Sequence, residues 1–349
     1  MKATELKEIT GKLGEKRDLN PEEVEAAARA LASPREDAGA KERFLVALSE
    51  KGETGREVRV FAEVFRELAR DPGVEEWAGR AIDVCGTGGD RQGTFNISTV
   101  VALILASAGV PVFKHGNRSI TSSCGSADLL QALGVPLEID SDLARRSLEE
   151  LNFVFFFAPA YHPAFKEIMP VRQALAARGK RTVFNILGPL INPGRPARQL
   201  MGVFSEHWVP VLAEALNELG LKGGFVVHGR LPEAAGMDEI SCATENRVAG
   251  FGAFHGTDET WNSDRFSLPG CPLEVLAGGD LEENLKILEA ILEGEGPEGL
   301  VNSILLNAGL ALRVQGVSGS VEEGIELARE RLLGGAVGDL CRKIKTFYE

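Results

Sequence analysis

The segment AIDVCGTGGD, residues 81–90, passes from a short apolar run into a glycine-rich loop, residues 85–90. Residues 81–84 are predicted to form a strand, and the glycines after them let the backbone approach a ligand closely. Residues 94–99, TFNIST, then lead into an almost wholly apolar helix, whose first turn offers free N–H groups and a positive dipole end. This order favours an anion site, although a tight turn capped by Ser98 explains the glycines alone about equally well.

Beyond residue 81, short β-branched or aromatic runs alternate with helical patterns. This alternation is typical of a parallel sheet with crossover helices. The predicted strands are residues 81–84, 110–114, 153–157, 183–186, 200–204 and 225–228. The predicted helices are residues 100–108, 129–133, 142–151 and 209–219, followed in the last third of the chain by 281–292, 301–314 and 321–333. The fold class is therefore α/β, with a central, mostly parallel sheet flanked by helices.

The N-terminal part of the chain is predicted to be helical and without strands. Asn20 is placed to cap one helix, with Pro21 at its first position. A further helix, predicted at residues 163–177, interrupts the strand and helix alternation and can pack back on the N-terminal helices. We therefore expect two domains. They are a small helical domain of residues 1–73 and about 163–181, and an α/β catalytic domain of residues 74–162 and 182–349.

Composition and charge exclude several classes of partner. The chain has 349 residues and a formal net charge of -13, which repels polyanions, so we expect neither a nucleic acid nor an acidic membrane surface as a partner. No apolar run is long enough to span a bilayer, and no secretory signal is evident, so a cytoplasmic protein is expected. The five cysteines are odd in number and lack CxxC pairs, which favours reduced thiols over disulfides or zinc.

A second polar segment follows the strand predicted at residues 110–114. It reads KHGNRS at residues 114–119, continues through hydroxyl residues to Ser123, and reaches GSAD at residues 125–128. Ligands of parallel sheets collect at the carboxyl ends of the strands, so this segment and the glycine-rich loop should face one pocket. Together they bring cations and hydroxyls enough for more than one phosphate. A Lys and Arg pair in a loop is otherwise an ordinary solvated surface.

Two adjacent acids, Asp238 and Glu239, follow the strand predicted at residues 225–228. Mg²⁺ is usually held by one or two carboxylates together with substrate phosphates, which suits acids at the end of a strand. In so acidic a chain, the alternative is an ordinary surface pair. The phosphate site expected nearby is what favours the metal.

Arg172 stands in an apolar stripe of the helix predicted at residues 163–177. Phe165, Ile168 and Leu175 share its helical face, so the arginine is expected to point inward. Buried arginines are almost always paired, and the planar guanidinium suits a carboxylate. The partner is either a structural Asp or Glu or the carboxylate of a substrate.

A set of long motifs, in order along most of the chain, resembles one enzyme family, the anthranilate phosphoribosyltransferases of tryptophan biosynthesis. The motifs are GTGGD (86–90), TFNIST (94–99), KHGNRS (114–119), GSAD (125–128), APAYHP (158–163), MPVR (169–172), TVFNILGPLINP (182–193) and GMDE (236–239). The resemblance implies transfer of a phosphoribosyl group from phosphoribosyl pyrophosphate (PRPP) to the amine of anthranilate. It also implies Mg²⁺ as cofactor, a homodimer, and an α/β domain like that of the pyrimidine nucleoside phosphorylases.

The resemblance also implies roles for individual residues. Those implied for PRPP are Gly86, Gly89, Asp90, Thr94, Asn96, Ile97, Ser98, Thr99, Lys114, His115, Gly116, Asn117, Arg118, Ser119, Ile120, Thr121, Ser122 and Ser126. Those implied for anthranilate are Gly86, Asn117 and Arg172, and those for the metal are Ser98, Asp238 and Glu239. No enzyme nucleophile is expected, because the transfer passes through an oxocarbenium-like state. His115 is the nearest candidate for an optional general base.

Three places depart from the family's pattern. Arg91 stands where glycine is common, the loop at residues 230–236 is longer than usual, and residues 33–43 differ from the family's helical turn. Two other assignments compete with the resemblance. One is a pyrimidine nucleoside phosphorylase, which usually carries Lys-His-Ser-Gly where this chain has KHGN (114–117). The other is a noncatalytic relative that binds nucleotide or nucleic acid.

Overall fold

A central sheet organises the molecule. The computed structural model describes residues 3–118, 123–232 and 236–349. Among these residues the strand order is β3-β2-β1-β4-β5-β7-β8, with β6 beside β5. The strands are β1 (Ile82–Gly86), β2 (Val112–Gly116), β3 (Phe153–Phe157), β4 (Arg198–Gly202), β5 (Gly223–Arg230), β6 (Gly236–Met237), β7 (Glu245–Gly252) and β8 (Asp258–Trp261). The α/β class predicted from the sequence is confirmed.

The strands from β3 to β5 pair in parallel, whereas β6, β7 and β8 pair antiparallel. Each parallel strand matches a predicted one within a few residues. The strand predicted at residues 183–186 is wrong, because Val183–Asn185 forms a 3₁₀ helix, η2. Its apolar residues serve core packing and not strand pairing, since Phe184 packs edge-on against Phe65 with ring centroids 5.4 Å apart.

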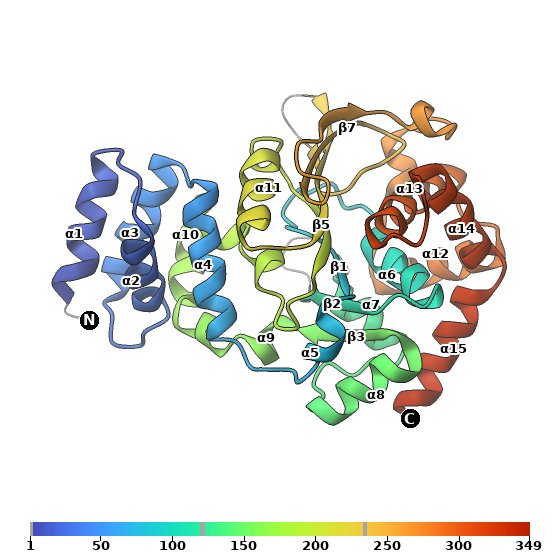
Figure 1. The fold of residues 1–349 in the computed structure, drawn as a ribbon, viewed down its shortest axis with the longest axis horizontal. Helices are drawn as coiled ribbons and strands as arrows, with labels where there is room; N and C mark the ends of the chain where they lie inside the picture. The colour runs from blue at the N-terminus through green and yellow to red at the C-terminus, as the bar shows by residue number, and fades with distance from the viewer. Residues whose placement is uncertain (1–2, 119–122, 233–235) are drawn as a thin grey trace.

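Helices cover both faces of the sheet (Figure 1). On one side, α11 (Trp208–Glu218) lies between the strands and the N-terminal helices α1 (Ala3–Gly14), α2 (Pro21–Leu31), α3 (Ala38–Lys51) and α4 (Gly55–Glu67). On the other side lie α6 (Ile97–Ser107), α12 (Leu281–Glu293), α13 (Glu298–Gln315), α14 (Val321–Leu333) and α15 (Ala336–Tyr348). Besides η2, the other helices of the described residues are α5 (Glu75–Ala78), α7 (Ser126–Ala132), α8 (Ser141–Leu151), α9 (Ala158–Tyr161), α10 (Met169–Ala177), η1 (Pro163–Glu167), η3 (Gly188–Ile191), η5 (Ser263–Phe266) and η6 (Leu273–Leu276).

The strand β3 is apolar on both faces. Phe153 and Phe155 belong to the core shared with α6 and α13, whereas Val154 and Phe156 pack with α5 and α8. Helix α6 is buried nearly all round, which explains its continuous apolar sequence. This burial holds the first turn of α6 near the carboxyl ends of the parallel strands, where the site lies. In the described part of the chain, no helix is both long and apolar enough to cross a membrane.

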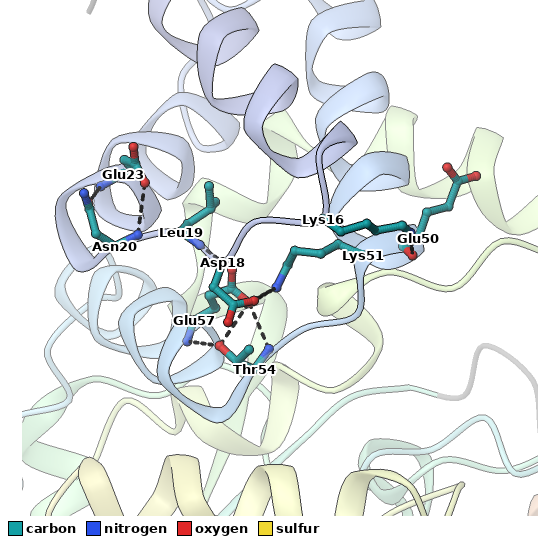
Figure 2. Close-up of polar contacts among 9 residues, drawn as sticks. All are labelled: Lys16, Asp18, Leu19, Asn20, Glu23, Glu50, Lys51, Thr54 and Glu57. Atoms are coloured by element: carbon teal, nitrogen blue, oxygen red, sulfur yellow. Dashed lines mark hydrogen bonds and ion pairs between the residues drawn. The ribbon is translucent and has the colours of Figure 1, made fainter.

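A buried ion pair ties the N-terminal helices together (Figure 2). Lys51 Nζ lies 2.8 Å from Glu57 Oε2, and the two side chains are 3% and 1% exposed. Glu57 also accepts hydrogen bonds from the backbone of Leu19 and Thr54, at 3.0 and 2.9 Å. Asp18 supplies a second carboxylate to Lys51 at 2.7 Å. One carboxylate therefore joins the end of α3, the start of α4 and the segment before α2.

Helix α10 packs on the N-terminal helices, as its spacing suggested. Ile168, Val171 and Leu175 belong to the same apolar cluster as α1 to α4, and Phe165 meets Phe65 edge-on with ring centroids 5.1 Å apart. This cluster continues through α11 to one face of β4 and β5. The division into a helical and an α/β domain stays a prediction, because a single apolar core crosses the proposed boundary.

Candidate active site

A cleft of about 490 Å³ opens where the parallel strands end. Most residues predicted for the site line it: Gly86, Gly89, Asp90, Thr94, Asn96, Ser98, Thr99, Lys114, His115, Gly116, Asn117, Arg118, Ser126, Arg172, Asp238 and Glu239. The side chain of Ile97 is buried in the core, which leaves only its backbone near the site. Ser119, Ile120, Thr121 and Ser122 lie outside the described residues. Segments far apart in the sequence thus meet at the carboxyl ends of the parallel strands.

The glycine-rich loop is held in place by its own backbone. Gly88 and Gly89 have φ values of +68° and +77°, in the region that glycine adopts without strain. The N–H of Thr87 donates to the carbonyl of Gly202 on β4 at 3.0 Å. The N–H of Gly88 donates to Asp238 Oδ2 at 2.6 Å. The loop is therefore anchored to β4 and to the acidic pair.

Two glycines make room for Asp238. Gly86 and Gly202 face each other in the register of β1 and β4. A Cβ on Gly86 would lie 2.1 Å from Asp238 Oδ2, and one on Gly202 would lie 1.4 Å from the Asp238 carbonyl oxygen. No side chain fits at either position unless Asp238 moves. The strand pairing thus brings Asp238 up to the loop.

The carboxylates of Asp90, Asp238 and Glu239 lie near one another, each on a half-buried residue. Glu239 Oε1 accepts a hydrogen bond from the Ser98 N–H at 3.0 Å, at the start of α6. Asp90 Oδ2 and Glu239 Oε2 are buried, and no donor among the described residues bonds to them. Burial, then the charge of Asp90, raises the pKa of Asp238 to about 7. Burial, then the charge of Asp238, raises the pKa of Glu239 well above its usual range.

These unsatisfied carboxylate oxygens fit a hard divalent cation. Buried, unpaired negative charge is costly, and Mg²⁺ prefers carboxylate oxygen ligands. Throughout residues 3–118, 123–232 and 236–349, no three His, Cys, Asp or Glu side chains are grouped to hold a metal by themselves. An ion bound by Asp238 and Glu239 would therefore need oxygens from substrate or water, which is the usual way in which proteins hold Mg²⁺.

Lys114 lies beneath the acids. It is only 2% exposed, and its Nζ donates to the Val84 carbonyl at 2.6 Å and to Ser98 Oγ at 3.0 Å. Burial lowers the pKa of Lys114, while Asp83 and the acidic pair oppose that effect. Its ammonium therefore lies at the floor of the site, with Ser98 as its contact at the start of α6.

His115 is paired with His162, their Nε2 atoms lying 3.2 Å apart. Both rings are buried, and burial lowers the pKa of His115 well below its usual range and that of His162 to about 4. Both imidazoles are therefore neutral at pH 7, with one donating its N–H to the other. A general base at His115 would be a weak one.

The polar residues of the second segment are largely bonded within the protein. Arg118 donates to Asp128 Oδ1 at 2.5 Å and to Gln131 Oε1 at 2.7 Å, both on α7. Asn96 donates from Nδ2 to the Cys124 carbonyl at 3.2 Å and accepts from Asn284 Nδ2 at 3.0 Å. These bonds fix the two polar segments against each other and against α12.

Arg172 projects from α10 into the other side of the cleft. Its Nη2 donates to the Phe184 carbonyl at 3.3 Å, and its guanidinium carbon lies 5.7 and 5.4 Å from the ring centroids of Phe165 and Phe184. Burial lowers its pKa. Among the described residues, no Asp or Glu pairs with Arg172. The structural ion pair, one of the two partners considered from the sequence, is therefore not seen.

Comparison with known proteins gives consistent matches over nearly the whole chain. Residues 78–337 match the model of the glycosyl transferase family, a/b domain. The anthranilate phosphoribosyltransferase of Persephonella marina is 37% identical over 342 residues, covering 98% of each chain. The chain belongs to the anthranilate phosphoribosyltransferase family. The recognition made from its motifs is confirmed, and the chain is an enzyme of the glycosyltransferase class.

Solved structures of family members agree with this assignment. The anthranilate phosphoribosyltransferase of Thermus thermophilus is 39% identical, with a TM-score of 0.88 over 97% of this chain and 99% of that one. The Saccharomyces cerevisiae enzyme, solved in complex with PRPP and Mg, is 24% identical and shares the fold, with a TM-score of 0.85 over 100% of this chain and 98% of that one. Membership of this family favours the phosphoribosyltransferase over the noncatalytic and nucleoside phosphorylase alternatives.

Arg91 stands where the anthranilate phosphoribosyltransferases commonly have glycine, and of the three departures it lies nearest the site. Its backbone has a conformation suited to glycine. Its φ of +62° lies in the left-handed region, which costs a non-glycine residue about 1–2 kcal/mol. The second departure is the longer loop at residues 230–236, of which residues 233–235 lie outside the described part of the chain. The third departure is the segment of residues 33–43, in which Asp37 caps α3 by accepting a hydrogen bond from the Ala40 N–H at 2.8 Å.

Sequence reasoning missed several residues of the cleft. Arg181 and Lys180 line it from the connection after α10, and Met169 and Gln173 line it from α10 itself. Gly202 and Asn284 act from outside the cleft by fixing Asp238 and Asn96. Met169 lies within the motif at residues 169–172 and Arg181 directly precedes the motif at residues 182–193, and these were the available signals. The others depend on strand register and helix packing.

Proposed function

We propose that this enzyme transfers the phosphoribosyl group of PRPP to the amine of anthranilate, giving N-(5-phospho-β-D-ribosyl)anthranilate and pyrophosphate in tryptophan biosynthesis. The observation that carries the proposal is the two-sided cleft. One side combines a glycine-rich loop, a helix N-terminus and buried acids with unsatisfied oxygens. The other side presents Arg172, a cation for which no described carboxylate is a partner. A phosphorylated sugar and an aromatic acid match these two sides.

The PRPP side is built from the glycine-rich loop, residues 94–99 and residues 114–126. Loop N–H groups and the start of α6 would bind the pyrophosphate, with Lys114 supplying positive charge beneath them. Asp238, Glu239 and Ser98 would hold Mg²⁺ together with substrate oxygens. When bound, Mg²⁺ would neutralise charge on the leaving pyrophosphate.

Arg172 would hold the anthranilate carboxylate. A guanidinium forms two parallel hydrogen bonds to a carboxylate, and burial strengthens them. Phe165 and Phe184 flank the guanidinium and restrict its orientation. Gly86 and Asn117 lie on the loop side of the same cleft, where they would contact the ring or the amine.

The chemistry requires positioning more than acid or base catalysis. The arylamine lone pair forms the new N–C1 bond as the C1–O bond to pyrophosphate breaks, and the electron pair of that bond leaves with pyrophosphate. The ammonium formed on nitrogen then releases a proton to water. Holding two bound reactants in line contributes most of the rate, with charge stabilisation of the leaving group. His115, neutral and of low pKa, is not required for proton removal.

The assay for this function follows the loss of anthranilate fluorescence on addition of PRPP and Mg²⁺, with pyrophosphate release measured in parallel. We expect equal consumption of anthranilate and production of pyrophosphate. No fluorescence loss at saturating PRPP and Mg²⁺ would contradict the proposal. Phosphorolysis of a pyrimidine nucleoside in the same preparation would favour the nucleoside phosphorylase.

We also propose a cytoplasmic homodimer built through the helical domain. A groove of about 400 Å³ between α3 and α10 supports a self-associating face, because Val46, Ala47 and Leu175 line it between charged residues of both signs. The five free thiols are consistent with a reducing compartment. Light scattering after size-exclusion chromatography tests the dimer, and Val46→Glu should dissociate it.

A further inference from the structure

Arg181 contacts the backbone of the glycine-rich loop. It lies in the connection between α10 and η2, and its Nη2 donates to the Gly89 carbonyl at 2.8 Å. Its guanidinium carbon lies 3.8 Å from the centroid of the Phe204 ring. Phe204 follows β4, and its N–H donates to Thr87 Oγ1 at 3.1 Å. Arg181 therefore bridges the middle of the loop and the end of the strand that anchors it.

The loop needs such a contact in order to bind an anion. When backbone N–H groups turn toward an anion, neighbouring carbonyl groups turn away from it and need partners of their own. The loop is also flexible in principle, since Gly88 and Gly89 carry no side chains. Thr87 and Gly88 are fixed through their N–H groups to Gly202 and Asp238. The Gly89 carbonyl is fixed by Arg181.

The position of Arg181 in the chain links the two sides of the cleft. Arg172 lies on α10 and Arg181 lies in the connection that follows this helix, and both residues line the cleft. Burial, then the charge of Arg91, lowers the pKa of Arg181, whereas Asp90 opposes the shift. Arg181 therefore lies among charged residues of the loop while its backbone belongs to the segment that carries Arg172.

We propose that Arg181 is a positioning residue that holds the glycine-rich loop in its anion-binding conformation and joins it to the α10 connection. This inference rests on the proposed function, because it assumes that the loop binds the pyrophosphate of PRPP. The alternative is that Arg181 contributes only positive charge at the mouth of the cleft. A lysine retains the charge but not the planar face that stacks on Phe204 or the forked donor geometry.

The test compares Arg181→Ala and Arg181→Lys with Arg265→Ala. Arg265 is a matched control, because it also stacks on an aromatic ring, 4.9 Å from the Trp261 centroid, and donates to Glu259 at 2.5 Å. For Arg181→Ala we expect KM for PRPP to rise about tenfold, the effect of losing one charge-assisted hydrogen bond. KM for anthranilate should stay within about twofold, and Arg181→Lys should recover little of the loss.

Calorimetric titration with pyrophosphate and Mg²⁺ provides a readout that does not depend on turnover. The Kd of Arg181→Ala should exceed that of the wild-type enzyme by about the same tenfold factor. A Kd and KM equal to those of Arg265→Ala would overturn the proposal, as would full recovery by Arg181→Lys. A wild-type enzyme that binds pyrophosphate, loses that binding in Arg181→Ala and yet does not consume anthranilate would refute the proposed function while supporting the role of Arg181.

Discussion

The backbone N–H of Gly88 donates to Asp238 Oδ2 over 2.6 Å, joining two segments that lie 150 positions apart in the sequence. The contact makes the glycine-rich loop and the acidic pair a single structural unit. It depends on β1 and β4 being neighbours, because Asp238 passes over Gly86 and Gly202 to reach the loop. A change in the packing at these glycines should therefore affect metal binding.

Gly202→Ala should disable Mg²⁺-dependent turnover. Its Cβ would lie 1.4 Å from the Asp238 carbonyl oxygen, so the acidic pair must move. A displacement of about 1 Å at a catalytic centre costs on the order of 100-fold in rate, and we expect at least that loss in kcat/KM. Gly11→Ala serves as control, because nothing lies within 4 Å of its Cβ. Near-normal kcat/KM in Gly202→Ala would show that Asp238 need not hold its place.

Arg172→Ala should weaken anthranilate selectively. Loss of two charge-assisted hydrogen bonds to a carboxylate should raise KM for anthranilate about 100-fold, with KM for PRPP changed less than about threefold. Arg313→Ala is the matched control, because Arg313 is also half-buried and stacks on a ring, 5.4 Å from the Phe254 centroid. Steady-state kinetics with each substrate varied measures both constants. An equal rise in the two KM values would exclude the clamp.

The thermal stability of the metal-free enzyme should fall as the pH rises from about 4 to about 7. Burial raises the pKa of Asp238 from 3.8 to about 7, so the protonated carboxyl is favoured in the folded state. Its stabilising contribution is complete below pH 3.8 and is lost as the pH rises through about 7. Asp238→Asn cannot ionise, so its Tm should decline less between about pH 4 and about pH 7. Parallel Tm curves for the two proteins would contradict the burial of this charge.

Glu57→Gln should destabilise the fold without changing the chemistry. The substitution leaves Lys51 with Asp18 as its remaining carboxylate and weakens the hydrogen bonds that the charged Glu57 makes, which should cost about 1–3 kcal/mol. Urea unfolding monitored by circular dichroism measures the free energy of unfolding. The control is Glu282→Gln, whose pair with Lys286 is 79% and 68% exposed and should contribute less than about 1 kcal/mol. A loss in Glu57→Gln no larger than in this control would show that the buried pair is not stabilising.

The sequence predicted the parallel strands because each is a local apolar run followed by glycine or polar residues. It failed at residues 183–186, where the same composition serves packing against Phe65. It also missed β7, whose residues include Gly250, Gly252 and Asn246. Gly250 is required because its Cβ would lie 2.1 Å from the Phe254 carbonyl oxygen, and Gly252 has a φ of +60°. These residue types indicate turns. Gly250 and Gly252 lie at the end of β7, at the turn that follows it, and Asn246 donates from Nδ2 to the carbonyls of Ser241 and Thr244 in the turn before it.

Within the site, local motifs predicted the loop, the helix N-terminus and the acids. They did not predict that Gly202, which has no side chain, leaves room for Asp238, because that relationship arises only when β1 pairs with β4. The contacts of Lys114 with Val84 and Ser98 likewise arise only when β2 pairs with β1. Arg181 could not be placed either, since its partner is a backbone carbonyl with no signature in the sequence.

The two edges of the sheet have opposite characters. The strand β8 exposes Asp258 and Glu259, and such charges discourage another chain from adding a strand there. The strand β3 reads FVFFF and carries no charge, so the packing of its neighbours alone keeps it from pairing with other copies. Once heating exposes β3, aggregation should outpace refolding, and the lifetime of this enzyme at high temperature will be set by its rate of unfolding.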